Sequence, residues 1–144
     1  MLGVDTRAIY RGILIAQGGA TRAGLFGSNI NTANVVAAMF VACGQDAGSV
    51  FESGWSQLTA ELDEVNSDLT VSLYIPSLFV GSVGGGTGYA TQKEALKMLG
   101  CDGPGKKWAF AETIAAFCLA LDVSTTGAVY NDTFASGHKK LARL

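Results

Sequence analysis

A glycine-dense stretch, GSVGGGTGYATQK at residues 81–93, has the composition of a loop that could hold phosphate groups. A P-loop needs Gly-x4-Gly-Lys-Ser/Thr, so that backbone amides and a lysine surround the phosphates. Gly81 and Gly86 have this spacing, but Thr87 stands where the lysine is required. A Rossmann turn needs Gly-x-Gly-x-x-Gly, and Tyr89 takes its last position. Taken alone, the loop is therefore more typical of a tight backbone approach than of a nucleotide site.

Few other side chains could do chemistry. Asp46 is a candidate acid, base or hydrogen-bonding group, and the single histidine, His138, has no partner nearby in the sequence. Cys43 and Cys118 lie in apolar patterns typical of buried thiols, and Cys101 is far from both in the sequence. No spacing matches a metal-binding motif, so we expect no metal.

The composition predicts one domain that associates with copies of itself. A chain of 144 residues can bury one core. Because 49% of the residues are hydrophobic and only 15% are charged, few charges cover the surface, and we expect at least a homodimer. The net charge of −2 gives no basis for binding nucleic acid. We interpret Lys106-Lys107 and Lys139-Lys140 as solvated helix ends, because cations favour helix C-termini.

No segment is expected to enter a membrane. The N-terminal stretch MLGVDTRAIYR contains Asp5 and lacks the apolar core of a signal peptide. The longest strictly apolar run, residues 35–43, is far shorter than the roughly 20 residues that a spanning helix needs. The simplest expectation is a cytoplasmic protein.

The first half of the chain predicts two helices. Residues 5–17 place Ile9 and Ile13 on one face of an amphipathic helix, and residues 18–29 form a glycine-rich loop. Residues 31–43 form a helix capped by residue 31 or 32. This second helix is apolar nearly all round, so it should be central and buried.

The second half predicts a hairpin followed by helices. Residues 50–62 read as a strand, and residues 69–75 alternate apolar and polar side chains as a half-buried strand does. A helix over residues 90–99 ends at Gly100, and two more follow at residues 108–121 and 125–144. The last helix carries an apolar stripe at heptad-like spacing, formed by Tyr130, Phe134, Gly137, Leu141 and Leu144. The prediction is a single compact α+β domain over residues 1–144, with helices packed on a small sheet.

Three segments in the same order resemble the catalytic domain of hydroxymethylglutaryl-coenzyme A reductases. The stretch IPSLFVGSVGGGTGYATQKEALKMLG resembles that family's glycine loop and the glutamine-containing helix that ends in Met-Leu-Gly. Upstream, NINTANVVAAMFVACGQDAGSV resembles its asparagine-containing helix and Ala-Cys-Gly-Gln-Asp segment, and FASGHKKLARL resembles its last catalytic helix. The resemblance covers residues 5–144 and implies the large, substrate-binding domain of the family.

The resemblance also implies what this chain lacks. The family reduces a coenzyme A thioester twice with NADPH, using a glutamate, a lysine, an aspartate and a histidine. The glutamate, the lysine and the small NADPH-binding domain precede the matched part. We therefore expect no autonomous reductase activity and no bound cofactor.

Only some of the family's functional residues are present at the matching positions of this chain. The aspartate corresponds to Asp46 and a substrate-contacting asparagine to Asn34, whereas Asn31 replaces a family histidine. Counting five residues from His138 puts Arg143 at the position of the catalytic histidine. One of four catalytic residues is therefore expected to survive.

Our first hypothesis is a repurposed, non-redox enzyme of the cyclase, isomerase or lyase type. It would act on a hydrophobic metabolite, as in natural-product biosynthesis, within an apolar cleft at a subunit interface. Asp46 and Arg143 are the candidate catalytic residues. The expected substrate-binding set is Asn31, Asn34, Gln45, Gly84, Gly85, Gly86 and Thr87.

Two alternatives stay open: a non-catalytic binding or assembly protein, and a fragment of a true reductase completed by a partner chain. An enclosed apolar pocket facing Asp46 would favour the enzyme. Local backbone hydrogen bonds to Asp46 without a cavity would favour the scaffold, since short loops are often capped by a carboxylate. The asparagines could equally be helix caps, and Arg143 a solvated terminus.

Overall fold

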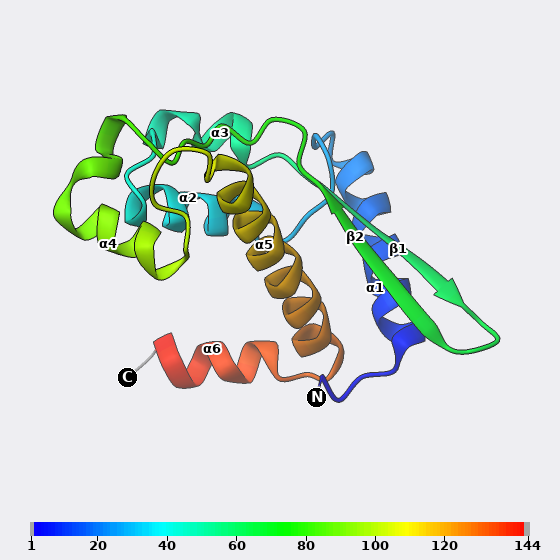
Figure 1. Ribbon diagram of the computed structural model, residues 1–144. Helices are drawn as coiled ribbons and strands as arrows, with labels where there is room; N and C mark the ends of the chain where they lie inside the picture. The colour runs from blue at the N-terminus through cyan, green and yellow to red at the C-terminus, as the bar shows by residue number, and fades with distance from the viewer. Residues whose placement is uncertain (1, 143–144) are drawn as a thin grey trace.

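The computed structural model describes residues 2–142 and confirms the α+β class (Figure 1). Within this range one antiparallel hairpin lies at one side of the molecule and packs with one face on α1 and α5. The elements are α1 (Thr6–Arg22), α2 (Thr32–Ala42), the 3₁₀ helix η1 (Ala47–Ser49), α3 (Val50–Ser53), β1 (Gln57–Asp63), β2 (Asp68–Tyr74), the 3₁₀ helix η2 (Gly85–Gly88), α4 (Ala90–Met98), α5 (Lys107–Tyr130) and α6 (Phe134–Ala142).

The hairpin turns one apolar face inward. Its register pairs Leu58 with Leu73 and Ala60 with Val71. Because side chains alternate across a strand, these apolar pairs share one face. That face packs against Ile13 of α1, as the two-residue period of the second strand predicts.

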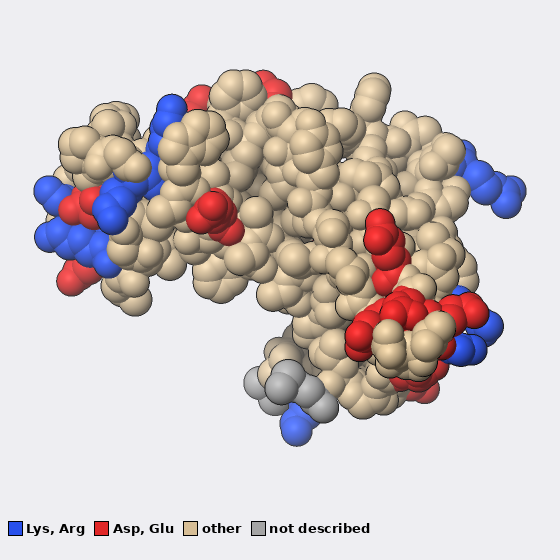
Figure 2. Space-filling view, turned by 45° about the vertical axis from the view of Figure 1, so that its right-hand side comes forward, with Lys and Arg blue, Asp and Glu red and all other residues tan. Residues whose placement is uncertain are grey.

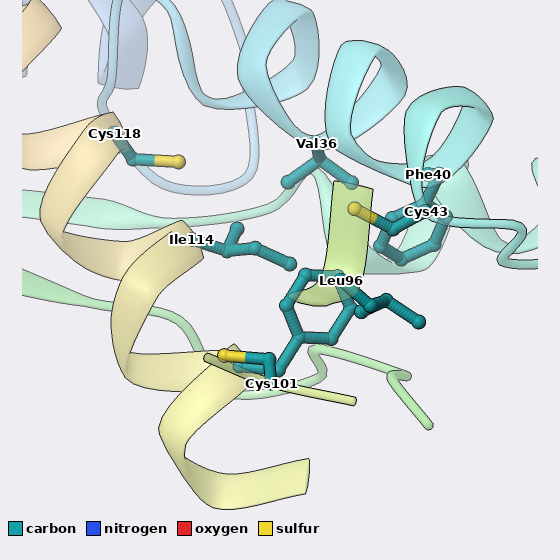
Figure 3. Packing of buried hydrophobic residues seen from close by; sticks show 8 residues of the cluster. Val36, Phe40, Cys43, Leu96, Cys101, Ile114 and Cys118 are labelled. Carbon is teal, nitrogen blue, oxygen red and sulfur yellow. The ribbon is translucent and has the colours of Figure 1, made fainter. Parts of the chain in front are cut away.

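A second apolar cluster lies where α2, α4 and α5 meet (Figure 3). Phe40 of α2, Leu96 of α4 and Phe110 of α5 are completely buried there. Figure 3 shows Phe40 and Leu96 pointing into the same space. This cluster fixes the positions of the segments that follow α2 and precede α4.

The longest helix corrects the sequence analysis. Two helices follow Gly105 as expected, but the break predicted between residues 121 and 125 is absent: α5 runs unbroken over Lys107–Tyr130, and the chain turns at residues 131–133, where Asp132 has φ 61°. By length and composition α5 could cross a membrane, but Ile114 and Cys118 lie in the core of this domain. It is the axis on which α1 and α2 pack.

Four other predictions need correction. Residues 50–62 are not one strand, because α3 precedes β1. Helix α1 continues through residues 18–22, which were expected to be loop. Helix α2 buries one face only, since Val41 is 68% exposed. Lys106 and Lys107 stand at the N-terminal end of α5, not at a helix C-terminus.

Charged side chains gather at both ends of the face shown in Figure 2. Lys and Arg lie with some acidic side chains at the end formed by α4, and Asp and Glu lie with some basic side chains at the hairpin end. The surface between them is largely uncharged. Arg143 and Leu144 lie outside the described residues.

Candidate functional site

Two glycines lock the chain after α2 against the glycine loop. Gly44 ends α2 with φ 68°, and the Gln45 N–H donates to the carbonyl of Phe40 at 2.9 Å, as in a Schellman cap. A Cβ built on Gly44 would stand 2.4 Å from the carbonyl carbon and oxygen of Gly86, and one on Gly86 would stand 2.9 Å from the Gly44 oxygen. Only glycine fits at either position.

The side chain of Gln45 holds the same two segments together. Its Oε1 accepts from the Gly81 N–H at 2.8 Å, and its Nε2 donates to the Gly81 carbonyl at 3.0 Å. Nε2 also donates to the Cys43 carbonyl at 3.0 Å. Gln45 was expected to bind substrate, but in this structure both ends of its amide are engaged with backbone. We call Gly44, Gln45, Asp46 and residues 81–88 the glycine rim.

Asp46 is exposed at the edge of the rim and is oriented locally. Its Oδ1 accepts from the Gly48 N–H at 3.0 Å, and its Oδ2 accepts from the Ser49 hydroxyl at 3.2 Å. A carboxylate oxygen can accept more than one hydrogen bond. The carboxylate therefore caps η1 and still has lone pairs open to solvent.

The loop itself is shaped by positive backbone angles. Gly84 and Gly85 have φ 82° and 54°, in the region that favours glycine. The Thr87 hydroxyl, expected to contact substrate, donates instead to the Gly84 carbonyl at 2.6 Å. Both Gly84 and Gly85 are exposed, so their backbone can reach a ligand.

The two asparagines lie at the other end of α2. At 1.5 Å per residue, the eleven residues of α2 separate its ends by roughly 16 Å. The Asn31 side chain donates to the Thr125 hydroxyl at 2.8 Å, which ties it to α5, whereas Asn34 is exposed. The structure therefore brings Gln45, Asp46 and the loop together and leaves the asparagines apart from them.

A buried carboxylate that the sequence analysis overlooked anchors this far end. Asp122 of α5 has no exposed surface, and its two oxygens accept from the N–H groups of Ile30 at 3.1 Å and Asn31 at 2.7 Å. Its position within an apolar helix was a signal in the sequence, because an acidic residue is seldom fully buried without partners. Asp122 fixes where α2 begins.

The cysteines are not candidate nucleophiles. Burial raises the pKa of the Cys118 thiol to about 11, and the charge of Asp122 adds to the shift. Burial and, secondarily, Cys101 raise the pKa of the Cys43 thiol. Thiols of this kind stay protonated at neutral pH and behave as apolar packing groups.

Neither of two surface hollows includes Asp46. One, of about 220 Å³, lies between the loop and α5 and is lined by Gly81, Ser82, Val83, Gly105, Lys107 and Trp108. The other, of about 380 Å³, is a groove between α5 and α6 that includes Phe134 and His138. Both open to solvent.

His138 is exposed in that groove. Its ring packs on Phe134 with the centroids 4.3 Å apart, and Nδ1 lies 2.9 Å from the Phe134 carbonyl oxygen. This contact orients the ring and leaves Nε2 as the nitrogen that can meet a ligand. The apolar stripe expected on this helix lines the groove through Gly137 and Leu141.

Comparison of the sequence with known proteins identifies the family of the chain. The model of the family "Hydroxymethylglutaryl-coenzyme A reductase" matches residues 2–143. The 3-hydroxy-3-methylglutaryl-coenzyme A reductase of Haloferax volcanii is 43% identical over 130 residues, which is 87% of this chain and 32% of that protein. The corresponding protein of Methanocaldococcus jannaschii is 38% identical over 117 residues, covering 81% of this chain and 28% of its own length.

The chain thus spans about a third of the length of these curated relatives. The family match extends from α1 to α6 and includes the segments that build the glycine rim. The resemblance stated from the sequence is confirmed: the chain belongs to the hydroxymethylglutaryl-coenzyme A reductase family.

Proposed function

We propose that the glycine rim is the substrate-facing part of a 3-hydroxy-3-methylglutaryl-coenzyme A reductase active site. Segments outside these 144 residues, on the same or another polypeptide, would complete it. The observation that carries the proposal is the Gln45 amide, which ties the turn bearing the exposed Asp46 carboxylate to the glycine loop. The identity with the Haloferax volcanii reductase supports it.

Asp46 would act through a cation. Hydride addition to a thioester places negative charge on the carbonyl oxygen, and a nearby positive group stabilises that charge. A carboxylate cannot do so itself, but it can hold a lysine such as the one that the family resemblance implies. The local bonds from Gly48 and Ser49 orient Asp46 for this role. NADPH would supply the hydride, held mostly by segments outside these 144 residues, because the described residues form no standard dinucleotide motif.

His138 is a better proton donor than Arg143. A guanidinium does not give up its proton in proteins, whereas histidine is the side chain that enzymes use most often for proton transfer. Helix α6 packs mainly against the end of α5, away from the rim. We therefore propose that His138 acts in a site whose glycine rim belongs to another copy of the chain.

The non-redox hypothesis has less support. A cyclase or isomerase acting on a hydrophobic metabolite needs an apolar enclosure beside its acid or base. The two hollows described above are open, and Asp46 lines neither. The local hydrogen bonds of Asp46 favour the scaffold alternative. Both alternatives stay predictions that the following experiment separates from a reductase role.

The direct test is a chimera. Residues 2–142 replace the matched third of the Haloferax volcanii reductase, and NADPH oxidation is followed with the thioester as substrate. We expect turnover, because the rim would be completed by the relative's own segments. A chimera that is folded and binds NADPH but does not turn over would contradict the proposal and favour a repurposed or scaffold protein.

We also propose that the chain forms a homo-oligomer through the exposed face of α5 and α6. Phe117, Leu121 and Leu141 are 51%, 42% and 81% exposed, and their burial against a second copy would be favourable at about 25 cal/mol per Å². Sedimentation equilibrium should show at least a dimer that Leu121→Glu converts to a monomer. Thr70→Glu, on the exposed face of β2, is the control and should leave the dimer intact. A monomeric wild-type chain at micromolar concentration would contradict this.

A further inference from the structure

One side chain attaches the Asp46 turn, residues 44–49, to the glycine loop, residues 81–88. The Asp46 carboxylate accepts its hydrogen bonds from its own turn. Those bonds orient the carboxylate on η1, but they do not set its distance from the loop. In the part of the chain that the structure describes, the hydrogen bonds that join the turn to the loop are the two between Gln45 and Gly81.

The Gln45 amide bonds to both backbone groups of one loop residue. Its Oε1 accepts from the Gly81 N–H at 2.8 Å, and its Nε2 donates to the Gly81 carbonyl oxygen at 3.0 Å. Nε2 also donates to the Cys43 carbonyl oxygen at 3.0 Å, which fixes the amide to the end of α2. These contacts need a donor and an acceptor on one side chain, whereas an ionised glutamate only accepts and a methionine sulfur is a weak acceptor. Gln45 therefore sets both the distance and the direction of the loop relative to the turn.

The close approach of two glycines cannot replace this attachment. A Cβ on Gly44 would lie 2.4 Å from the Gly86 carbonyl, so the backbones are in contact there. Such a contact limits how near the two segments come, but each pair of atoms in it attracts only weakly. Gly84 and Gly85 have positive φ, and glycine restricts the backbone less than any other residue. Without the Gln45 amide, we expect the loop to move away from the turn.

We propose that Gln45 is a positioning residue, whose side-chain amide holds the Asp46 turn at a fixed distance from the glycine loop. The inference rests on the proposed reductase function, in which a ligand on the loop meets a cation held by Asp46. A displacement of about 1 Å in such a site can slow a reaction about 100-fold. Gln45 was expected to bind substrate, but both ends of its amide are engaged, so it acts through Asp46 instead.

A double-mutant cycle in the chimera tests this role. Gln45→Met keeps the length of the side chain and removes its three hydrogen bonds. We expect kcat to fall about tenfold or more, with KM for the thioester little changed. In the Asp46→Asn chimera the same substitution should change kcat by less than about twofold, because residues that act as a unit have non-additive effects. A merely structural role would lower kcat by the same factor in both chimeras.

Gln17→Met is the matched control. The Gln17 Nε2 also donates to a distant backbone carbonyl, that of Leu58 at 2.6 Å, but this bond joins α1 to β1. Gln17→Met should lower the Tm of the chimera without changing kcat. Equal losses of kcat from Gln45→Met in both backgrounds would overturn the proposal, as would a Gln45→Met chimera that is as active as the Gln17→Met chimera.

The isolated chain offers a measurement that needs no turnover. A Cβ on Gly44 would lie 2.8 Å from the Thr87 nitrogen, so a nuclear Overhauser cross-peak between the Gly44 α protons and the Thr87 amide proton reports the contact of turn and loop. We expect Gln45→Met to weaken this cross-peak and Gln17→Met to leave it unchanged. If the wild-type chimera does not turn over, the reductase proposal fails and the cross-peak still tests Gln45. A cross-peak that Gln45→Met leaves unchanged would overturn the inference.

Discussion

Replacing Gly44 by alanine is expected to lower the free energy of unfolding by about 3 kcal/mol. Two effects add. The residue has φ 68°, which costs an L side chain roughly 1 kcal/mol or more, and the new methyl group would lie 2.4 Å from the Gly86 carbonyl. The rim would have to open, which also strains the Gln45 hydrogen bonds to Gly81. Urea denaturation followed by circular dichroism measures the change.

Gly88→Ala is the matched control for this prediction. Gly88 lies in the same loop, a Cβ added to it would meet nothing within 4 Å, and its φ is not positive. We expect its stability to stay within about 0.5 kcal/mol of wild type. If Gly44→Ala behaved like Gly88→Ala, the two segments would not be locked as described.

Replacing Asp122 by alanine should also cost about 3 kcal/mol. The substitution removes the side-chain acceptors of the Ile30 and Asn31 N–H groups and leaves a cavity in the core. The start of α2 would lose its attachment to α5. Thermal unfolding should show a clear fall in Tm, and proteolysis should become faster near residue 30.

The variant Asp122→Asn separates the contribution of the hydrogen bonds to stability from the contribution of side-chain volume. Asparagine keeps one acceptor oxygen but turns an amide NH₂ group toward the second N–H, so we expect a loss of about 1–2 kcal/mol. An alanine variant no less stable than the asparagine variant would contradict the account of Asp122 as an anchor.

Local patterns predicted most of the elements. The alternation of residues 69–75 predicted β2 nearly to the residue, and Gly100 ends α4 with φ 67°, as a C-terminal glycine should. The break expected after residue 121 was wrong because Asp122 is satisfied by backbone more than 90 residues away in the chain. No local pattern contains that contact, and a polar residue in a helix otherwise suggests an end.

The site was harder to predict than the fold. Sequence similarity proposed Gln45 and Asp46 together with the glycine loop, and in the structure they share a turn with Gly44 that lies against that loop. It grouped Asn31 with them, although Asn31 bonds to Thr125 on α5 at the opposite end of α2.

The most direct test of the central claim is the effect of Asp46→Asn on turnover in the chimera. If Asp46 holds a catalytic cation, kcat should fall by about 100-fold or more, with KM for the thioester little changed. Asp63→Asn is the control, because Asp63 also accepts a local N–H bond, from Val65 at 2.9 Å, but on the hairpin turn. It should leave the rate unchanged. An Asp46→Asn chimera as active as the Asp63→Asn chimera would contradict the claim that the rim carries reductase chemistry.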